Sequence, residues 1–150
     1  MRFDVPAPMR ARLAEYEGFH RSVGNEVCHY LGIPSIIVGA ASLLALASLG
    51  VVAGHRLSLA ELVAAAIVAF YVARARWLGV VTGSLLAALV LFGRALPWYA
   101  GLALFLGGWA LQFVGHALYE KRSPAFLRNL VHLLVGPAWL VERAFARGAH

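Results

Sequence analysis

Three polar residues follow one another at four-residue intervals near the end of a long apolar segment: Gln112, His116 and Glu120. On an α-helix each such step turns about 400°, so the three side chains form one polar stripe on an apolar surface. An ionisable group inside an apolar span costs a few kcal/mol unless it faces a cavity or a partner. This cost favours a functional role for His116, whereas Gln112 and Glu120 are equally well explained as partners of neighbouring helices.

Further histidines lie in the two polar segments that flank the apolar region. His20 and His29 belong to the sequence YEGFHRSVGNEVCHYLGIP, and His132 follows the last apolar segment. Neutral imidazole binds iron, zinc, copper or nickel, and Gln, Asn and Glu commonly orient such ligands by hydrogen bonds. The single Cys28 excludes an internal disulfide and a cysteine-cluster metal site. The remaining histidines are expected to be solvated or structural: His55 and His150.

The composition is that of a membrane protein. Hydrophobic residues make up 61% of the 150 residues, charged residues 13%, and the mean hydropathy is +0.76, which is too apolar for a water-soluble domain of this size. We predict one all-α integral-membrane domain, 1–150, without a cleavable signal peptide. It would contain four transmembrane helices, with short amphipathic helices before the first and after the last. The predicted spans are 35–54, 57–73, 77–93 and 97–119, between flanking segments 1–34 and 120–150.

The distribution of basic residues predicts the orientation. With four spans, eleven of the 13 Lys and Arg residues share the side of the two termini, and only Arg56 and Arg94 lie on the other. The positive-inside rule therefore places both termini in the cytoplasm, and we expect an integral protein of a bacterial inner membrane. The basic residues are spread along the chain and mostly border spans, so they favour contact with the lipid bilayer over nucleic-acid binding.

The elements around the spans must bring the histidines together. Met9, Leu13, Tyr16 and His20 follow 4-3-4 spacing, which predicts an amphipathic helix with His20 on its apolar edge. His20 and His29 would point in opposite directions on one continuous helix. A break at Gly24–Asn25, with Asn25 as a helix cap, would let them meet, and 32–34 would end that second helix before the membrane.

Similar signals surround His132. Ser123–Pro124 is a typical helix start, and Gly136–Pro137 a typical helix end, so a short helix carrying Arg128 and His132 is expected to fold back toward His116. Two small-xxx-small patterns, 50–54 and 79–83, predict close helix packing.

The histidine blocks resemble a known family. H(20)-x4-N-x3-H(29)-x2-GIP, and later W-x2-QFVGH-x3-E-x3-PA followed by N-x2-H and GP, are similar to the small membrane proteins that convert phytosphingosine to odd-numbered fatty acids. The resemblance spans about 16–142. It implies a non-haem Fe(II) dioxygenase that uses O2 to shorten 2-hydroxy fatty acids by one carbon, an α-oxidation.

The resemblance also implies roles for residues. It gives His20, His29 and His116 as ligands of Fe(2+), and we add His132 as a fourth candidate. We expect Glu120 and Asn25 to be catalytic, with Glu120 either orienting His116 or binding the metal itself. The residues expected to bind substrate are Arg128, Arg122, Gln112 and Tyr16.

Other classes of protein stay open from the sequence alone. A haem protein would use two histidines as axial ligands, and a metal-free scaffold or transport component would tolerate loss of the histidines. A di-metal hydroxylase normally needs about eight histidines, more than the six present. The sequence leaves open whether the chain forms a homo-oligomer.

Overall fold

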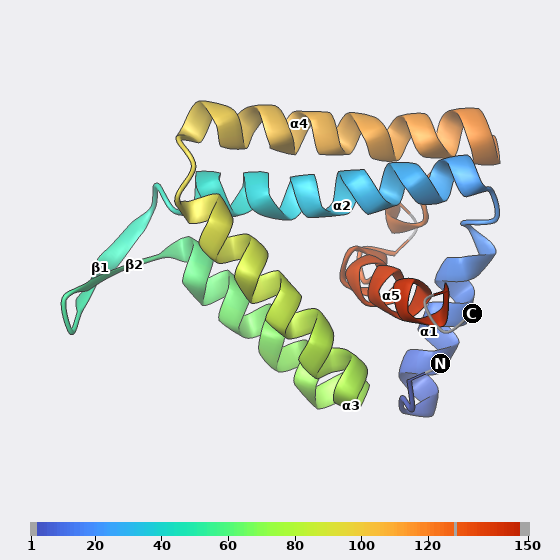
Figure 1. Cartoon of the computed structure of the whole chain (residues 1–150), viewed down its shortest axis with the longest axis horizontal. Coiled ribbons are helices and arrows are strands. Elements are labelled where there is room, and N and C mark those ends of the chain that lie inside the picture. The colour runs from blue at the N-terminus through green and yellow to red at the C-terminus, as the bar shows by residue number, and fades with distance from the viewer. Residues whose placement is uncertain (1–2, 128, 148–150) are drawn as a thin grey trace.

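The computed structural model describes residues 3–127 and 129–147, without the side chains of 125 and 147. Figure 1 shows a pair of long antiparallel helices, a helical hairpin that diverges from them, and shorter helices at the opposite end. The elements in chain order are α1 (Ala7–Gly18), α2 (Val23–Leu44), β1 (Ser48–Val52), β2 (His55–Ser58), α3 (Leu59–Arg94), α4 (Trp98–Val114), the π-helix η1 (Gly115–Glu120), the 3-10 helix η2 (Ala125–Leu127) and α5 (His132–Arg147).

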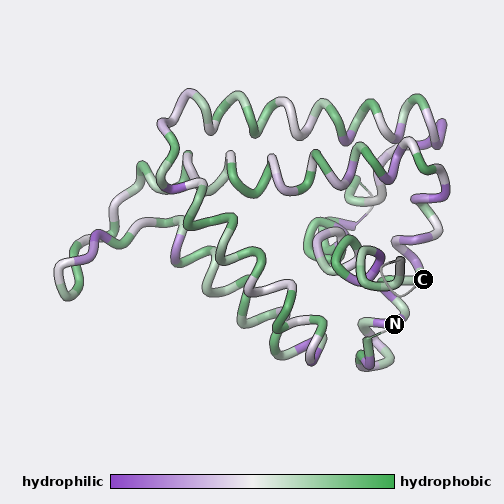
Figure 2. Tube along the Cα trace, viewed as in Figure 1, coloured by the Kyte–Doolittle hydropathy of each residue, from purple (hydrophilic) through white to green (hydrophobic). Residues whose placement is uncertain are grey.

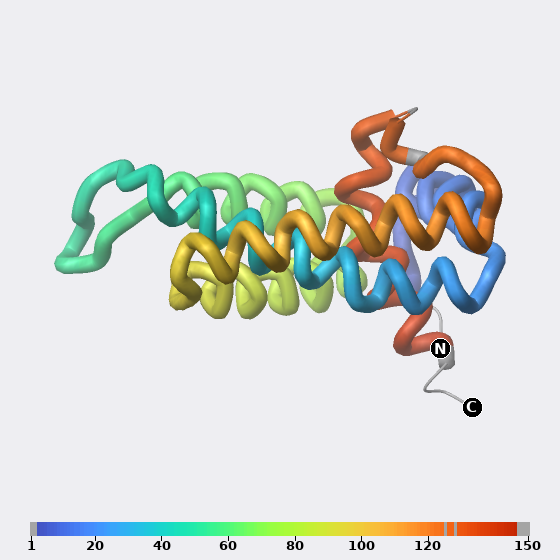
Figure 3. Tube along the Cα trace, turned by 90° about the horizontal axis from the view of Figure 1, so that it is seen from above, coloured from blue at the N-terminus to red at the C-terminus, as the bar shows by residue number. Residues whose placement is uncertain are grey.

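Glycines spaced seven residues apart, at 101, 108 and 115, allow α4 and the start of η1 to lie close against α2. A Cβ atom on Gly108 would lie 2.8 Å from the carbonyl oxygen of Gly32, and one on Gly115 would lie 2.5 Å from Asn25 Oδ1. Gly101 faces Ser42 equally closely. The missing side chains allow the two backbones to approach at these three positions, and Figure 3, seen from above, shows α4 lying over α2 and crossing it.

α3 consists of two arms that meet at Arg76, whose φ of 50° and ψ of −130° are not helical. Gly79 packs directly against the carbonyl oxygen of Tyr71, and a Cβ on Gly83 would lie 3.2 Å from Val68, so the second arm returns along the first. The predicted spans 57–73 and 77–93 correspond to these arms. The close packing predicted from the glycine pattern 79–83 is confirmed.

The prediction of an all-α protein is wrong at residues 48–58, which form an antiparallel β-hairpin. Gly50 and Gly54 have φ of 127° and 81°, values that glycine adopts freely, and the β-branched Val51 and Val52 between them favour a strand. The span predicted at 35–54 is therefore wrong in its second half, because α2 ends at Leu44. The glycine pattern 50–54 shapes this hairpin and packs no helices.

The start of α2 also differs from the prediction. Ser22 caps the helix by accepting a hydrogen bond from the backbone N–H of Asn25, so Asn25 lies inside the helix and no break occurs at Gly24–Asn25. The helix also continues through Pro34, where we expected it to end. Gly32 and Gly39, on either side of Pro34, pack against α4, and this packing favours a continuous helix despite the hydrogen bond that proline removes.

α1 and α5 pack together across the end of the α2–α4 pair. Met9, Leu13 and Tyr16 are buried, as the 4-3-4 spacing predicted, and meet Val135 and Trp139 of α5 in one apolar cluster. The hydroxyl of Tyr71 donates a 2.6 Å hydrogen bond to the carbonyl oxygen of Leu134 and joins α5 to α3. The short helix predicted from 124 is confirmed only as the single 3-10 turn η2 (Ala125–Leu127), because a separate helix, α5, begins at His132 and continues through Pro137, where the predicted helix would end.

The surface suggests an integral membrane protein. Within the described residues, three helices are long and apolar enough to cross a bilayer: α2, α3 and the continuous Trp98–Glu120. Many large apolar side chains on them are exposed, including Leu91, Leu106 and Phe113. Figure 2 shows hydrophilic residues gathered where α1 meets α2 and where α4 ends. The prediction of four spans is not confirmed by this count.

Candidate metal centre

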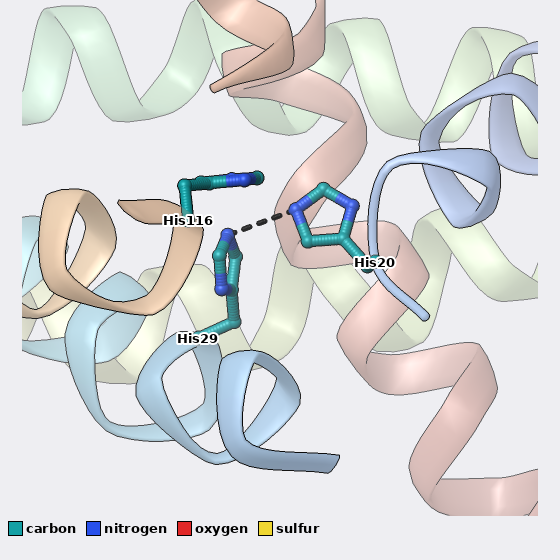
Figure 4. A group of neighbouring side chains, drawn as sticks. All are labelled: His20, His29 and His116. Carbon is teal, nitrogen blue, oxygen red and sulfur yellow. Dashed lines mark hydrogen bonds between the residues drawn. The ribbon is translucent and has the colours of Figure 1, made fainter. Parts of the chain in front are cut away.

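Three buried histidines converge where the end of α4 meets the start of α2. His20, His29 and His116 are each at most 2% exposed, and one ring nitrogen of each lies within 4.8 Å of those of the other two. Figure 4 shows the three rings turned toward a common point from three separate segments. The structure thus brings together three of the four histidines that were predicted as ligands.

Each histidine is positioned by a local feature of the chain. α1 ends at Gly18, so His20 lies in the turn before α2, where its ring stacks on Tyr16 with centroids 4.0 Å apart. His29 lies in the second turn of α2. His116 belongs to the π-helix η1, a rare widening of the helix that is frequent at functional sites.

The hydrogen bonds fix which nitrogen carries the proton in two of the rings. Nδ1 of His20 donates to the carbonyl oxygen of Tyr16 at 2.6 Å, and Nδ1 of His29 donates to that of Asn25 at 2.9 Å. Burial, followed by the neighbouring His29, lowers the pKa of His20 to about 3, so this ring is neutral near pH 7. Neutral imidazole has one N–H, and Nε2 therefore carries a lone pair in both rings.

The two lone pairs face each other. Nε2 of His20 and Nε2 of His29 are 3.0 Å apart, a distance at which two acceptors repel unless a cation lies between them. Two nitrogens bonded at about 2.1 Å to one metal, at right angles, are also about 3.0 Å apart. The third ring, His116, has a buried Nδ1 without a hydrogen-bond partner. This arrangement of donors fits a first-row transition metal.

Glu120 and Asn25 support the histidines through the backbone. One carboxylate oxygen of Glu120 accepts hydrogen bonds from Arg21 N, Ser22 N, Ser22 Oγ and Asn25 Nδ2, at 2.8 to 3.2 Å. Asn25 in turn holds His29 through its carbonyl oxygen. Glu120 does not belong to the group of converging ligand atoms in the described residues, so its contacts favour a positioning role over metal binding.

A cavity of about 170 Å³ adjoins the histidines and is bounded by α1, α2, α4 and α5. Its wall includes Gln112, whose amide nitrogen is buried without a hydrogen-bond partner. Tyr16 also lines it, and burial raises the pKa of the Tyr16 hydroxyl. The remaining wall is largely apolar, with Ile36 and Trp109 among its members. The cavity therefore offers a polar donor beside the histidines and hydrocarbon elsewhere.

The other expected site residues lie outside the three-histidine group or outside the described residues. His132 is 3% exposed and lines the same cavity, but it does not belong to the three-histidine group. Its Nε2 lies 3.5 Å from a carboxylate oxygen of Glu15. Arg122 is exposed in the turn after η1, and Arg128 lies outside the described residues.

Sequence reasoning missed the role of Ser22. It caps α2 and binds Glu120 with both its N–H and its hydroxyl. The available signal was a serine directly before the helix, followed by Glu26 in the first turn.

Comparisons with known proteins agree on one family. Residues 7–147 match the family profile described as 2-hydroxy-palmitic acid dioxygenase Mpo1-like. A curated relative, the 2-hydroxy-palmitic acid dioxygenase MPO1 of Saccharomyces cerevisiae (strain ATCC 204508 / S288c), is 31% identical over 137 residues, which covers 85% of this chain and 73% of that protein. No solved structure matches the chain significantly.

Proposed function

This chain belongs to the Mpo1-like family of 2-hydroxy-palmitic acid dioxygenases, and from that membership we propose that it is an Fe(II)-dependent dioxygenase of 2-hydroxy fatty acids. The observation that carries the proposal is the convergence of His20, His29 and His116, with two lone pairs facing each other at 3.0 Å. Imidazole ligands suit iron among other first-row metals, and the dioxygenase name of the family and of the yeast relative implies a reaction with O2, for which iron is a suitable metal.

The proposed reaction balances without a further reductant. A 2-hydroxy acid, R–CH(OH)–COOH, reacts with O2 to give R–COOH, CO2 and water. The bond between the carboxyl carbon and the hydroxyl-bearing carbon breaks, and the latter becomes the new carboxyl carbon. All four electrons that O2 accepts come from the substrate, so no nicotinamide or flavin partner is needed.

The protein's own residues would hold the reactants in place. The three histidines would bind the iron, which would supply the redox chemistry, and the hydroxyl and carboxylate of the substrate would lie beside them. The amide nitrogen of Gln112 has no hydrogen-bond partner in the protein and lines the cavity. It would donate a hydrogen bond to the head group of the substrate. Arg122 and Arg128 are candidates for pairing with its carboxylate, and Tyr16 and His132 for shaping the cavity.

Glu120 and Asn25 would act through the ligands. Glu120 fixes the backbone at residues 21 and 22 and the side chain of Asn25, and these groups determine where His20 and His29 lie. Asn25 keeps His29 in the tautomer whose Nε2 is free. We assign both residues a positioning role in catalysis.

We further propose that the chain crosses the bilayer four times, with the arms of α3 counted separately. The arms on either side of Arg76 each reach the minimum length for a span of about 17 residues. The basic residues beside the termini and Arg76 favour cytoplasmic termini in a bacterial inner membrane. The three histidines would then lie near the cytoplasmic interface, the depth at which a fatty-acid head group rests.

Metal reconstitution tests the proposed function. The purified protein is stripped with a chelator under anaerobic conditions, reloaded with Fe(II), Mn(II) or Zn(II), and given 2-hydroxypalmitate with O2. We expect the acid one carbon shorter only after loading with Fe(II). Equal turnover with Zn(II), or no turnover with any of these metals, would contradict the proposal, and a Soret absorption band in the purified protein would favour a haem protein instead.

A further inference from the structure

A second hollow, larger than the histidine cavity, lies between α2, the second arm of α3, and α5. Its volume is about 440 Å³. We call it the α2–α3–α5 groove, and its wall is almost entirely hydrocarbon: it includes Leu86, Leu89, Leu140, Val141 and Phe145. Tyr30 and Thr82 are the polar residue types in this wall, and the Thr82 hydroxyl oxygen is itself buried.

The groove and the histidine cavity share part of their walls. Ile33 and Ile37 of α2 and Pro137 of α5 line both. A flexible molecule whose head lies beside the three histidines therefore has to pass only Ile33, Ile37 and Pro137 to enter the groove. Two smaller hollows in the described residues, one between α1 and α5 and one between α1 and α3, share no wall residue with the histidine cavity.

The groove is also open to its surroundings. Leu85 and Phe145, both in its wall, are each 50% exposed, and the exposed Ala88 and Ala144 lie on the same rim. With the second arm of α3 spanning the bilayer, as proposed above, this rim would face lipid. A fatty acid therefore has a lateral route from the membrane into the groove, without its chain crossing water.

We propose that the α2–α3–α5 groove holds the alkyl chain of the 2-hydroxy fatty acid while the head group lies in the histidine cavity. The proposal rests on the proposed function and adds to it the residues that select the length of the substrate. Each methylene that moves from water into such a groove improves binding about fourfold. Chain-length preference should therefore follow the volume of the groove.

The first arm of the test measures selectivity in variants that fill the groove from its exposed rim, where folding is least affected. Ala88→Trp and Ala144→Trp occupy the space of several methylenes, and Ala103→Trp adds the same ring to an exposed face of α4 that borders neither hollow. We expect kcat/KM for 2-hydroxypalmitate to fall at least about tenfold in the rim variants, and that for a short 2-hydroxy acid to change less than about twofold. Ala103→Trp should match the wild type for both. Unchanged chain-length preference in both rim variants would overturn the proposal.

The second arm does not depend on turnover. A 2-hydroxy fatty acid with a diazirine at the end of its chain is photolysed with metal-free protein in lipid nanodiscs, with and without excess 2-hydroxypalmitate. We expect labelled peptides from 82–89 and 140–145, and loss of this label upon competition. Label confined to the outer face of α4, or label that the competitor does not remove, would show ordinary contact with lipid and overturn the proposal. Groove labelling without any turnover would instead contradict the proposed function and leave the groove assignment standing.

Discussion

Nε2 of His20 and Nε2 of His29 lie 3.0 Å apart, while Nδ1 of each ring donates to a backbone carbonyl oxygen. His20 lies before α2 and His29 within it. The only N–H of each neutral ring already donates to a backbone carbonyl oxygen and cannot form a hydrogen bond between the two rings. What is left is a pair of lone pairs that needs a cation between them. The fixed tautomers therefore leave this pair with two donors suited to bind a metal ion.

Replacing one member of the pair tests this reading. His29→Gln preserves most of the side-chain volume but presents an amide to the site, so we expect metal affinity to fall more than about 100-fold, beyond the loss typical of an outer hydrogen-bonding partner. Isothermal titration with Fe(II) under anaerobic conditions measures the change. His55→Ala, in the exposed β-hairpin, is the matched control and should bind as the wild type does. Equal affinity in His29→Gln and the wild type would refute the assignment.

Two substitutions of Glu120 separate positioning from metal binding. Glu120→Gln retains an oxygen that can accept from Arg21 N and Ser22 N, whereas Glu120→Ala removes it. We expect Glu120→Ala to destabilise the protein by about 1–3 kcal/mol, because the donors lose a charged acceptor, and to weaken metal binding about 10–100-fold. Glu120→Gln should retain most of the stability and most of the metal affinity, which thermal unfolding and metal titration measure. Loss of metal in Glu120→Gln without loss of stability would instead identify the carboxylate as a ligand.

The glycine contacts between α2 and α4 predict opposite effects at adjacent positions. A Cβ on Gly108 would lie 2.8 Å from the carbonyl oxygen of Gly32, whereas one on Gly107 meets nothing within 4 Å. Gly108→Ala should therefore destabilise the protein by about 1–3 kcal/mol. Gly107→Ala should be neutral or stabilising by up to about 1 kcal/mol, since alanine favours a helix. Unfolding in detergent measures both, and similar values for the two variants would contradict the helix pairing.

The proposed membrane orientation predicts which loops are reachable from outside. In a Cys28→Ser background, Ala53→Cys places a thiol in the β-hairpin turn and Ser123→Cys places one between η1 and η2. We expect a membrane-impermeant maleimide to label Ala53→Cys in intact cells, and Ser123→Cys only after the membrane is opened. The reverse pattern would overturn the orientation, and labelling of both in intact cells would overturn the four crossings.

Much of the helical structure could be predicted from the sequence, because hydrophobic segments and apolar spacing report it directly. The segment 97–119 closely matches the continuous helix Trp98–Glu120, and Met9, Leu13 and Tyr16 form the buried face of α1. The errors arose where a local signal competes with packing. Gly32 and Pro34 usually end a helix, but here Gly32 allows α4 to approach, and α2 continues.

A meeting of four histidines, His20, His29, His116 and His132, was predicted because the topology of the spans places the start of α2 beside the end of α4, and the structure brings the first three into one group. The remainder of the site depends on side-chain directions that spacing does not report. Glu120 lies one helical turn after His116, yet its carboxylate accepts hydrogen bonds from the backbone before α2 and does not join the three histidines. His132 was expected among the ligands, but α5 begins at this residue and leaves it at the cavity wall.

The most direct test of the central claim is mass analysis of the acid formed when Fe(II)-loaded protein and its His116→Ala variant are each given 2-hydroxypalmitate and O2. The account predicts that the wild type forms the acid one carbon shorter, one molecule for each O2 consumed, and that the variant forms none. Unchanged 2-hydroxypalmitate with the wild type, or equal product from the variant, would contradict it.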